Sequence, residues 1–342
     1  MKEIHPKIKI AILRILRDAN HPIGSAVIAH ELKSHGFELS SRSIRLYLQY
    51  LEDKGLVGKA MRGREGGRSI TPKGIVEIRD AQVFDRVGYT SVKIDSLACQ
   101  TTLHLAMRTG LIVLNVSTIE RDDLLQAVEE MLPVFESGLS MGEHLTFCRE
   151  GENLGHFTIP ERKVGIGTVC SVTLNGVMLN HGIPMTSRFG GVLEYNQKQC
   201  TRFTDVIDYA GTSLDPLEVF IKGKLTSVRE TARQGNGRIG ASFRETPSPV
   251  VSNVELIHRK LKIMGLGGIL LIGTPNQPLL DFPVQEGRTG LLVAGGLNPI
   301  AAVEEAGIST MNYALCTLYS FEKLFHYREM QKRAKDFLDR EK

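Results

Sequence analysis

Apolar residues recur every three or four positions in three stretches near the start of the chain. This is the spacing of one buried face of an α-helix, so each stretch predicts an amphipathic helix. Serine residues stand at two of the expected starts, where a side-chain oxygen can accept from a free backbone N–H. The predicted helices span residues 7–18, Ser25 to about Ser34, and Ser40 or Ser41 to about Gly55.

Beyond Gly55 the pattern changes to short apolar runs. Leu56-Val57 and residues 69–71 predict two strands that flank a loop rich in glycine and arginine. A further helix is predicted from Pro72, because proline is favoured in the first helical turn. Three helices followed by such a hairpin make a winged helix-turn-helix, which we expect over residues 1–80.

Residues 81–342 show both helical and strand-like patterns, which predicts a second domain of the α+β class. An amphipathic helix is expected around residues 122–136. A capping box formed by Ser252 and Glu255 predicts another helix. Asn236-Gly237, at the centre of an alternating segment over 228–245, predicts a β-hairpin. Strands are predicted at 109–119, 167–174, 267–273 and 289–296.

The second domain also contains a faint internal repeat. Residues 109–115 (TGLIVLN) resemble 267–273 (GGILLIG), and 167–175 (GTVCSVTLN) resemble 290–298 (GLLVAGGLN). The two pairs have different offsets, which predicts an insertion in the first half around the helix at 122–136. Two related halves are expected to face each other across a seam, where ligands often bind.

Charge is distributed unevenly between the two predicted domains. Residues 1–80 contain 15 Lys and Arg against 9 Asp and Glu, whereas the remaining residues contain 27 against 29. The chain as a whole has a net charge of +4, so all of the excess positive charge lies in the winged-helix segment. A basic terminal module on a nearly neutral body favours contact with nucleic acid.

Several classes of protein are disfavoured by what the sequence lacks. The five cysteines form no CxxC pair, and the histidines form no metal-binding motif, so we expect no metal site. Scattered cysteines and the lack of a signal peptide or long apolar run favour a cytoplasmic protein without a membrane segment. No catalytic motif occurs, and His156 and His181 are interpreted as ordinary polar residues, so neither catalysis nor a cofactor is expected.

The predicted third helix and the loop after it present the residues expected to contact double-stranded DNA. One face of the helix projects away from the apolar stripe and would enter the major groove. The glycines of the loop would allow its arginines to approach phosphates or the minor groove. An alternative is a winged helix that contacts protein. The predicted DNA-binding residues are Arg42, Ser43, Arg45, Gln49, Arg62, Arg64 and Arg68.

Two glycine-rich stretches of the second domain suit an anion. A predicted strand leads into Gly295-Gly296, followed by Asn298 as an expected helix cap and Pro299 in the first turn. Backbone N–H groups at such a helix start attract carboxylate or phosphate. Arg188 next to Gly190-Gly191 offers a cation. Alternatively, the first stretch is a plain strand-to-helix turn, and Arg188 belongs to a structural ion pair.

The body contains long segments that resemble the regulatory domain of the NrpR family, archaeal-type repressors of nitrogen-assimilation genes. The winged helix fits the same family, and the resemblance covers residues 1–320 approximately. It implies a repressor that binds an inverted-repeat operator and is released by 2-oxoglutarate. The segments that carry it are RVGYTSVKID, GTVCSVTLNGVMLNHGIP, RFGGVLE, YAGTSLDPLEVFI, ASFRE, IGTPNQPLLDFPV and GGLNPIAAVEEAGI.

A dicarboxylate effector of this kind requires fixed donors for two carboxylates and a polar partner for the keto oxygen. We assign these roles from local chemistry, since the resemblance itself supplies no ligand residues. The chain has room for one regulatory domain, whereas some members of the family carry two, so it would repress alone or with a second subunit. The predicted effector residues are Cys170, Ser171, Arg188, Gly190, Gly191, Thr212, Ser213, Gly295, Gly296 and Asn298.

An inverted-repeat operator also implies a homodimer or a larger assembly, because the symmetry of the site mirrors that of the protein. Apolar residues at the C-terminal end either form part of that interface or pack on the body. Two other functions are considered: an enzyme with a DNA-binding module, and a winged-helix protein of a larger assembly. The apolar residues in question are Phe321, Leu324, Phe325, Phe337 and Leu338.

Overall fold

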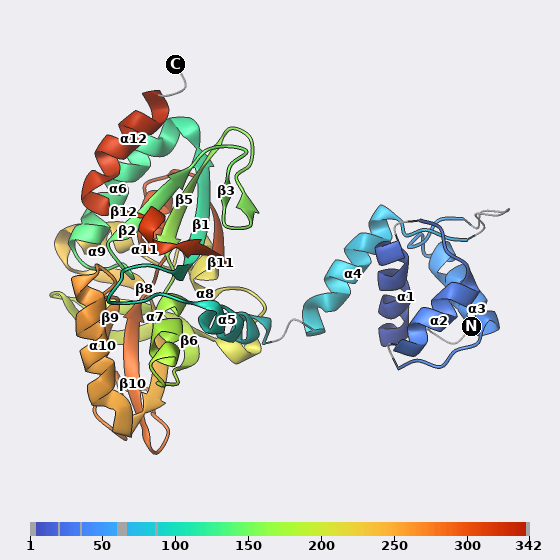
Figure 1. The fold of residues 1–342 in the computed structure, drawn as a ribbon, viewed down its shortest axis with the longest axis horizontal. Coiled ribbons are helices and arrows are strands. Elements are labelled where there is room, and N and C mark those ends of the chain that lie inside the picture. The colour runs from blue at the N-terminus through green and yellow to red at the C-terminus, as the bar shows by residue number, and fades with distance from the viewer. Residues whose placement is uncertain (1–4, 20, 35, 60–66, 86–87, 340–342) are drawn as a thin grey trace. The chain divides into compact units, whose positions relative to one another are not determined.

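The structure, a computed structural model, describes residues 5–19, 21–34, 36–59, 67–85 and 88–339. It divides the chain into two compact units, Met1–Val87 and Gly88–Lys342 (Figure 1). We call these the winged-helix unit and the two-sheet unit. The division lies a few residues beyond residue 80, because the fourth helix continues past that position.

The winged-helix unit has the helices expected from the sequence. Ser40 is the N-cap of the third helix, and its side chain accepts from the backbone N–H of Ser43. The two predicted strands are reduced to single bridges, between Val57 and Ile70 and between Ile23 and Arg68. The helices are α1 (Pro6–Ala19), α2 (Ser25–Ser34), α3 (Ser41–Asp53) and α4 (Pro72–Asp85).

The two-sheet unit contains two five-stranded antiparallel sheets, which confirms the predicted α+β class. The first has the order β11-β1-β5-β2-β12, and the second β7-β6-β8-β10-β9. The strands of the first sheet are β1 (Leu111–Glu120), β2 (His144–Cys148), β5 (Lys163–Val169), β11 (Met311–Ser320) and β12 (Phe325–His326). Those of the second are β6 (Thr186–Asn196), β7 (Gln199–Asp208), β8 (Gly237–Pro247), β9 (Ile269–Ile272) and β10 (Arg288–Ala294). A small hairpin pairs β3 (Asn153–Leu154) with β4 (Phe157–Thr158).

Helices connect and cover these sheets. The bounds of the longer ones follow the apolar pattern where it is strong, as in the helix predicted at 122–136. They are α5 (Tyr89–Gln100), α6 (Leu124–Glu136), α7 (Val172–Asn180), α8 (Pro216–Lys222), α9 (Val228–Gln234), α10 (Val251–Ile263), α11 (Asn298–Glu305) and α12 (Met330–Asp339).

The unit is built from two halves with the same order of elements. The first half runs β1, α6, β2, β5, α7, with the small β3-β4 hairpin added between β2 and β5, and the second runs β8, α10, β9, β10, α11. The strand that follows each half then crosses to the sheet of the other. β6 follows α7 but pairs with β8, and β11 follows α11 but pairs with β1. The two halves therefore exchange their last strands.

This arrangement corrects the predicted repeat. The counterpart of β1 is β8 rather than β9, so the match between 109–115 and 267–273 was wrong. The helix at 122–136 is no insertion, because α10 is its counterpart in the second half. The match between 167–175 and 290–298 does join equivalent regions, β5 with α7 and β10 with α11, although it is displaced by a few residues.

Three local predictions were also wrong. Residues 228–234 form α9, which ends at Gly235 in a left-handed conformation, so Asn236-Gly237 lies in a helix-to-strand turn rather than a hairpin. The strand predicted at 167–174 ends at Val169, and α7 begins three residues later. Ser252 lies inside α10, whose N-cap position is Val250 with no side-chain cap bond.

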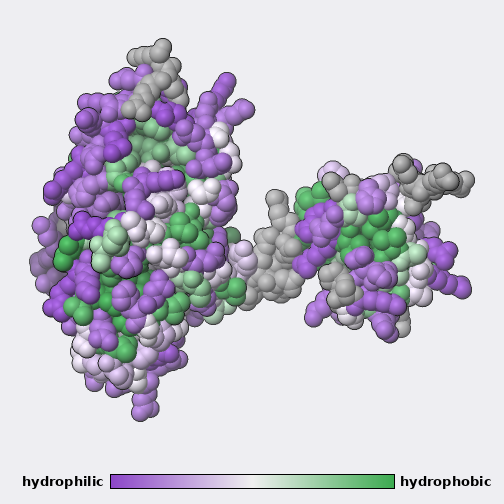
Figure 2. All heavy atoms as spheres, viewed as in Figure 1, coloured by the Kyte–Doolittle hydropathy of each residue, from purple (hydrophilic) through white to green (hydrophobic). Residues whose placement is uncertain are grey.

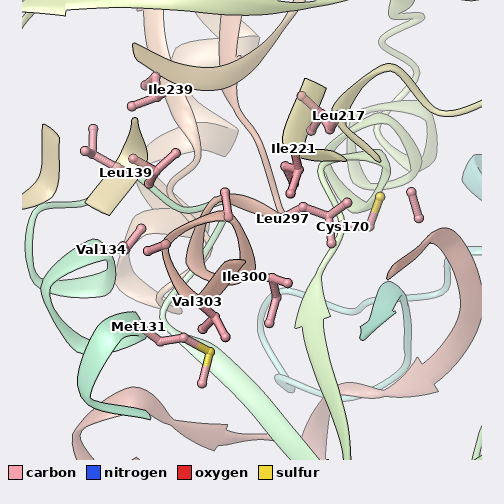
Figure 3. Close-up of a cluster of buried hydrophobic side chains, with 14 of the residues drawn as sticks. Met131, Val134, Leu139, Cys170, Leu217, Ile221, Ile239, Leu297, Ile300 and Val303 are labelled. Atoms are coloured by element: carbon pink, nitrogen blue, oxygen red, sulfur yellow. The ribbon is translucent and has the colours of Figure 1, made fainter. Parts of the chain in front are cut away.

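The helix α11 lies at the centre of the main core. Its side chains Ile300 and Val303 lie near Met131 and Val134 of α6, as Figure 3 shows. Ile221 of α8 belongs to the same cluster. The first six residues of α11, 298–303, are all buried. The start of α11 is thus enclosed by protein.

The apolar C-terminal residues pack on the body. Phe321 and Phe325 are buried, while Leu324, Phe337 and Leu338 pack against the cores. This packing agrees with the second of the two sequence-based alternatives. On the visible face of each unit, apolar residues lie between polar ones (Figure 2).

Candidate functional sites

The first candidate site is the outer face of α3. Ile44, Leu48 and Leu51 fix the helix on the core, which leaves Arg42, Arg45 and Gln49 on the exposed side, as predicted. Leu46 lies among them with 55% of its surface exposed. Ser43 is half-buried and bonded to the N-cap Ser40. The face thus offers two cations, an amide and an apolar side chain, the groups that read base edges in a major groove.

The loop arginines fall into two groups. Arg62 and Arg64 lie outside the described residues. Arg68 forms an ion pair with Glu52, with 2.7 Å between Nη2 and Oε2, and its side chain is only 16% exposed. Its backbone also bridges to Ile23. Arg68 thus ties the loop to α3, a geometry that suits support of the site better than contact with DNA.

The second candidate site surrounds Arg244 of β8, which sequence reasoning missed. Its side chain is 1% exposed. Nη1 donates to the Ser171 carbonyl at 2.8 Å and to Asn175 Oδ1, and Nη2 donates to Ser171 Oγ at 2.7 Å. Its Nε has no hydrogen-bond partner. Among the described residues no carboxylate pairs with Arg244, so a buried charge is left without an opposite charge.

The surroundings of Arg244 increase the positive potential. Ser171 is the N-cap position of α7, so the guanidinium lies at the positive end of that helix. Burial raises the pKa of the Cys170 thiol to about 11 and raises the pKa of the Tyr209 hydroxyl. Both groups are therefore neutral near pH 7 and cannot balance the cation. An anion would find a helix start and a guanidinium at one place.

Carboxyl groups with raised pKa values lie close to the same region. Burial raises the pKa of Asp215 to about 6 and that of Glu218 to about 7. Asp215 caps α8 by accepting from the backbone of Leu217. Glu218 accepts from the backbone N–H of Ala314 in β11.

Arg188, the predicted effector cation, lies next to this region but has a partner. Its Nη1 is 2.9 Å from Oε1 of Glu245, whose side chain is 1% exposed. The Arg188 side chain is 36% exposed. Of the two sequence-based readings, the structure therefore shows the ion pair.

The predicted glycines pack tightly against protein atoms. A Cβ at Gly296 would lie 2.3 Å from the Val169 carbonyl, and one at Gly295 would lie 2.8 Å from that of Gly240. Side chains of Pro216 and Phe203 occupy the space at Gly190 and Gly191. These glycines allow close packing of segments and leave no room beside them for a ligand.

Asn298 was expected to cap α11, but it is the first helical residue, and Leu297 is the cap without a side-chain bond. Its amide instead binds the Gly240 backbone through both groups and donates to the Leu139 carbonyl at 2.7 Å. Thr212 Oγ1 bonds within its own turn, to the backbone of Leu214. Ser213 is half-buried. The predicted set is thus only partly brought together, around Cys170 and Ser171.

Groups of three or more His, Cys, Asp or Glu suited to a metal ion do not occur among the described residues. None of the helices in the described part of the chain is both long and apolar enough to cross a membrane.

The fold defines a winged-helix protein with a two-sheet body of the α+β class. The model of the NrpR regulatory domains NRD1 and 2 matches residues 87–326, and that of the ribonuclease R winged-helix domain matches residues 10–78. The chain belongs to the NrpR family.

Named relatives and a solved structure agree with this assignment. The global nitrogen regulator NrpRI of Methanosarcina mazei is 33% identical over 92% of this chain and 96% of its own length. The global nitrogen regulator NrpR of Methanococcus maripaludis is 30% identical over 98% of this chain, which spans 57% of that relative. A crystal structure of a nitrogen repressor-like protein from Methanococcus jannaschii has a TM-score of 0.60 at 26% identity and covers 70% of this chain and 98% of its own.

Proposed function

We propose that this protein is a transcriptional repressor of nitrogen-assimilation genes that leaves its operator when 2-oxoglutarate binds the two-sheet unit. The names of the relatives support the nitrogen-regulatory role, and the exposed face of α3 supports contact with double-stranded DNA. Catalysis forms no part of this role. An inverted-repeat operator would be bound by a homodimer or a larger assembly, which light scattering at micromolar concentration would detect.

The effector proposal rests on one observation, the buried Arg244 at the start of α7. One carboxylate of 2-oxoglutarate would take the missing place opposite this guanidinium, where a bidentate pair is strong. Arg188 would turn from Glu245 to the second carboxylate, and Ser171 would supply a hydroxyl. Gly295, Gly296 and Asn298 would support the neighbouring start of α11 without touching the ligand.

Binding at this place would act on both halves at once. Ser171 and Asn175 belong to the first half, whereas Arg244 belongs to the second. A ligand that bridges them would change how the halves close, and with it the spacing of two winged-helix units in a dimer. By linkage, operator DNA must weaken 2-oxoglutarate binding by the same factor that 2-oxoglutarate weakens DNA binding.

Calorimetric titration of 2-oxoglutarate into the full-length protein tests the effector and its site. Arg244→Lys keeps the charge but loses the planar fork, so we expect affinity to fall at least about tenfold. Arg188→Ala should weaken binding less. Arg202→Ala is the matched control and should bind normally, because it removes an exposed arginine of β7 that pairs with Glu194 of β6.

The outcomes separate the ligand from its location. Absence of heat and of a thermal shift at millimolar 2-oxoglutarate would eliminate the effector claim. Normal affinity in both Arg244→Lys and Arg188→Ala would leave the effector but move it elsewhere. Equal affinity with and without operator DNA would contradict the coupling.

Substitutions in the winged-helix unit test the roles of helix and loop. Arg42→Ala, Arg45→Ala and Gln49→Ala should each cost about 1–3 kcal/mol and relax sequence preference. Arg62→Ala and Arg64→Ala should weaken binding to all sequences and flatten its salt dependence. Arg17→Ala, which removes an exposed arginine paired with Asp18 at the end of α1, is the control. Identical behaviour of helix and loop variants across operator sequences would refute this division.

A further inference from the structure

A cavity of about 610 Å³ lies in the two-sheet unit, away from Arg244. It is formed by the loop between α5 and β1 and by the C-terminal ends of α7 and α10. Arg244 contacts the opposite, N-terminal end of α7. The volume falls within the range of small-molecule sites, about 300–1,000 Å³. The cavity is thus large enough for a ligand of its own.

The charged residues that line the cavity, Arg108 and Lys260, are both cations, and two histidines lie with them. His104 and Arg108 come from the loop, His181 from the end of α7, and Lys260 from α10. None of the lining residues is acidic. Within the described ranges, neither Arg108 nor Lys260 has an acidic partner. All four residues are exposed, so their side chains can reach an anion that enters the cavity.

Carboxylates on the neighbouring segments are bonded elsewhere. Glu143 Oε2 is 3.0 Å from His326 Nε2. Glu322 accepts from the backbone of Gly110 at 3.1 Å and from the hydroxyl of Ser320 at 2.8 Å. Neither neutralises the cations of the cavity by a direct pair.

Backbone turns close the two helix ends at the cavity. The last carbonyls of α7 accept from Gly182 and Ile183, and those of α10 accept from Gly265 and Leu266. Helix ends closed by such turns have their carbonyls satisfied by backbone. Arg108 and Lys260 are therefore not needed as hydrogen-bond donors to these carbonyls.

Local hydrogen bonds to Nδ1 determine whether Nε2 of His104 and of His181 is a donor or an acceptor. His104 Nδ1 accepts from the backbone N–H of Met107 at 3.1 Å, so the hydrogen is on Nε2, which becomes a donor. His181 Nδ1 lies 2.8 Å from the Val177 carbonyl and must donate to it, so Nε2 of the neutral ring is an acceptor. His104 can thus donate to an unprotonated oxygen of a ligand, and His181 can accept from a hydroxyl group of a ligand.

The loop that carries Arg108 is held in a strained form. Arg108 has a left-handed φ of 56°, and its N–H donates to the His104 carbonyl at 2.8 Å. A bridge between His104 and Thr109 closes the same turn. Strain of this kind persists where surrounding structure fixes it, often at ligand sites.

The rest of the lining is apolar. Leu103, Leu105 and Met264 contribute to it, and Ile263 at its edge is 73% exposed. An exposed isoleucine beside a cationic pocket gains free energy if an apolar group covers it. The ligand should therefore combine an anionic head with an apolar body.

We propose that this cavity binds an organic phosphate monoester with an apolar body, as a second ligand site of the protein. A phosphate monoester carries a charge of about −1.5 to −2 at pH 7 and three acceptor oxygens, which matches several cations better than one carboxylate does. Arg108, Lys260 and the His104 Nε2–H bind the bare oxygens. His181 Nε2 accepts from the phosphate when it is singly protonated. The body lies on the leucines, Met264 and Ile263.

The test is calorimetric titration of the full-length protein with phenyl phosphate, inorganic phosphate, phenol and 2-oxoglutarate. Phenyl phosphate should bind at least about tenfold more tightly than inorganic phosphate or phenol. Arg108→Gln and Lys260→Gln should each weaken it about tenfold. Arg259→Gln removes a neighbouring cation of α10 that does not line the cavity, and it should bind normally. Ile263→Asn should weaken phenyl phosphate but not inorganic phosphate.

Three results would overturn this site. The first is the absence of phenyl phosphate binding at millimolar concentration. The second is unchanged affinity in the Arg108→Gln, Lys260→Gln double variant. The third is loss of 2-oxoglutarate binding in that double variant with phenyl phosphate unaffected, which would make the cavity the effector site. If Arg244→Lys abolishes 2-oxoglutarate binding and leaves phenyl phosphate binding intact, the two sites are separate.

Discussion

At the scale of single residues, the two-sheet unit buries one charge, on Arg244, that no carboxylate among the described residues pairs with. Arg244 lies inside a strand that is buried at eight successive positions, 239–246, together with Glu245. The segment ASFRE held a signal for this, because two charged residues follow directly on a buried apolar run. Its burial nevertheless depends on α7 packing against the strand, which the sequence pattern of 167–174 did not predict.

The carboxyl groups of α8 make stability depend on pH. Glu218 has a pKa raised from 4.5 to about 7, so the folded protein binds more protons than the unfolded chain between these values. Folding stability from this group is therefore present at low pH and is lost as pH rises from about 4.5 to about 7. Asp215 acts in the same direction, from 3.8 to about 6.

We expect the wild-type protein to lose stability relative to Glu218→Gln as pH rises from 5 to 8. Denaturant titrations of both proteins at each pH measure this difference. Histidines with lowered pKa values, His144 and His258, oppose the trend in the wild type but are shared by both proteins and cancel. Parallel pH profiles of the two proteins would show that Glu218 is not desolvated in solution.

At the scale of elements, prediction succeeded where a local pattern determined the structure. The helices α1, α3 and α6 have clear apolar stripes, and Ser40 caps α3 as expected. Prediction failed where contacts with segments distant in the sequence determine the local structure. Asn236-Gly237 has the composition of a hairpin turn, but Glu305 of α11 accepts from Val228 and Arg229 at the start of α9 and stabilises a helix there. Such a contact over a long sequence distance leaves no local signal.

The start of α11 offers a test at this scale. Gly296→Ala would place a Cβ 2.3 Å from the Val169 carbonyl, a backbone atom in a buried region, and should cost about 1–3 kcal/mol of stability. Gly211→Ala, where nothing lies within 4 Å of the new atom, is the matched control and should change stability by about 0.5 kcal/mol at most. Equal denaturation midpoints for the two variants would contradict the close packing of α11 against β5.

At the scale of the whole molecule, the chain length and the change of residue pattern near residue 80 predicted separate domains, and the structure divides into two units, Met1–Val87 and Gly88–Lys342. The internal repeat was only half recognised, because residues 109–115 and 267–273 are similar apolar strand sequences in non-equivalent positions. The spacing of elements is the better guide. Leu111 and Gly237, Leu124 and Val251, and Lys163 and Arg288 begin equivalent elements at nearly constant intervals.

Two units with separate cores predict two unfolding transitions in calorimetry of the full chain. A chain that ends at Thr310 lacks β11 and α12, so β1 loses its partner and α6 loses its cover. This truncated protein should keep the transition of the winged-helix unit and lose the other. Survival of both transitions would show that the exchanged strand is dispensable.

The exchange of strands also has a consequence for the way the protein is made. β1 leaves the ribosome about 190 residues before β11, its neighbour in the finished sheet. At typical rates of translation, this interval lasts roughly 10–40 s. During this interval the edge of β1 that pairs with β11 in the folded protein has no partner. Unpaired edges of apolar strands promote aggregation of nascent chains. The cell should therefore have to shield this protein during synthesis, with chaperones binding the chain until β11 has emerged.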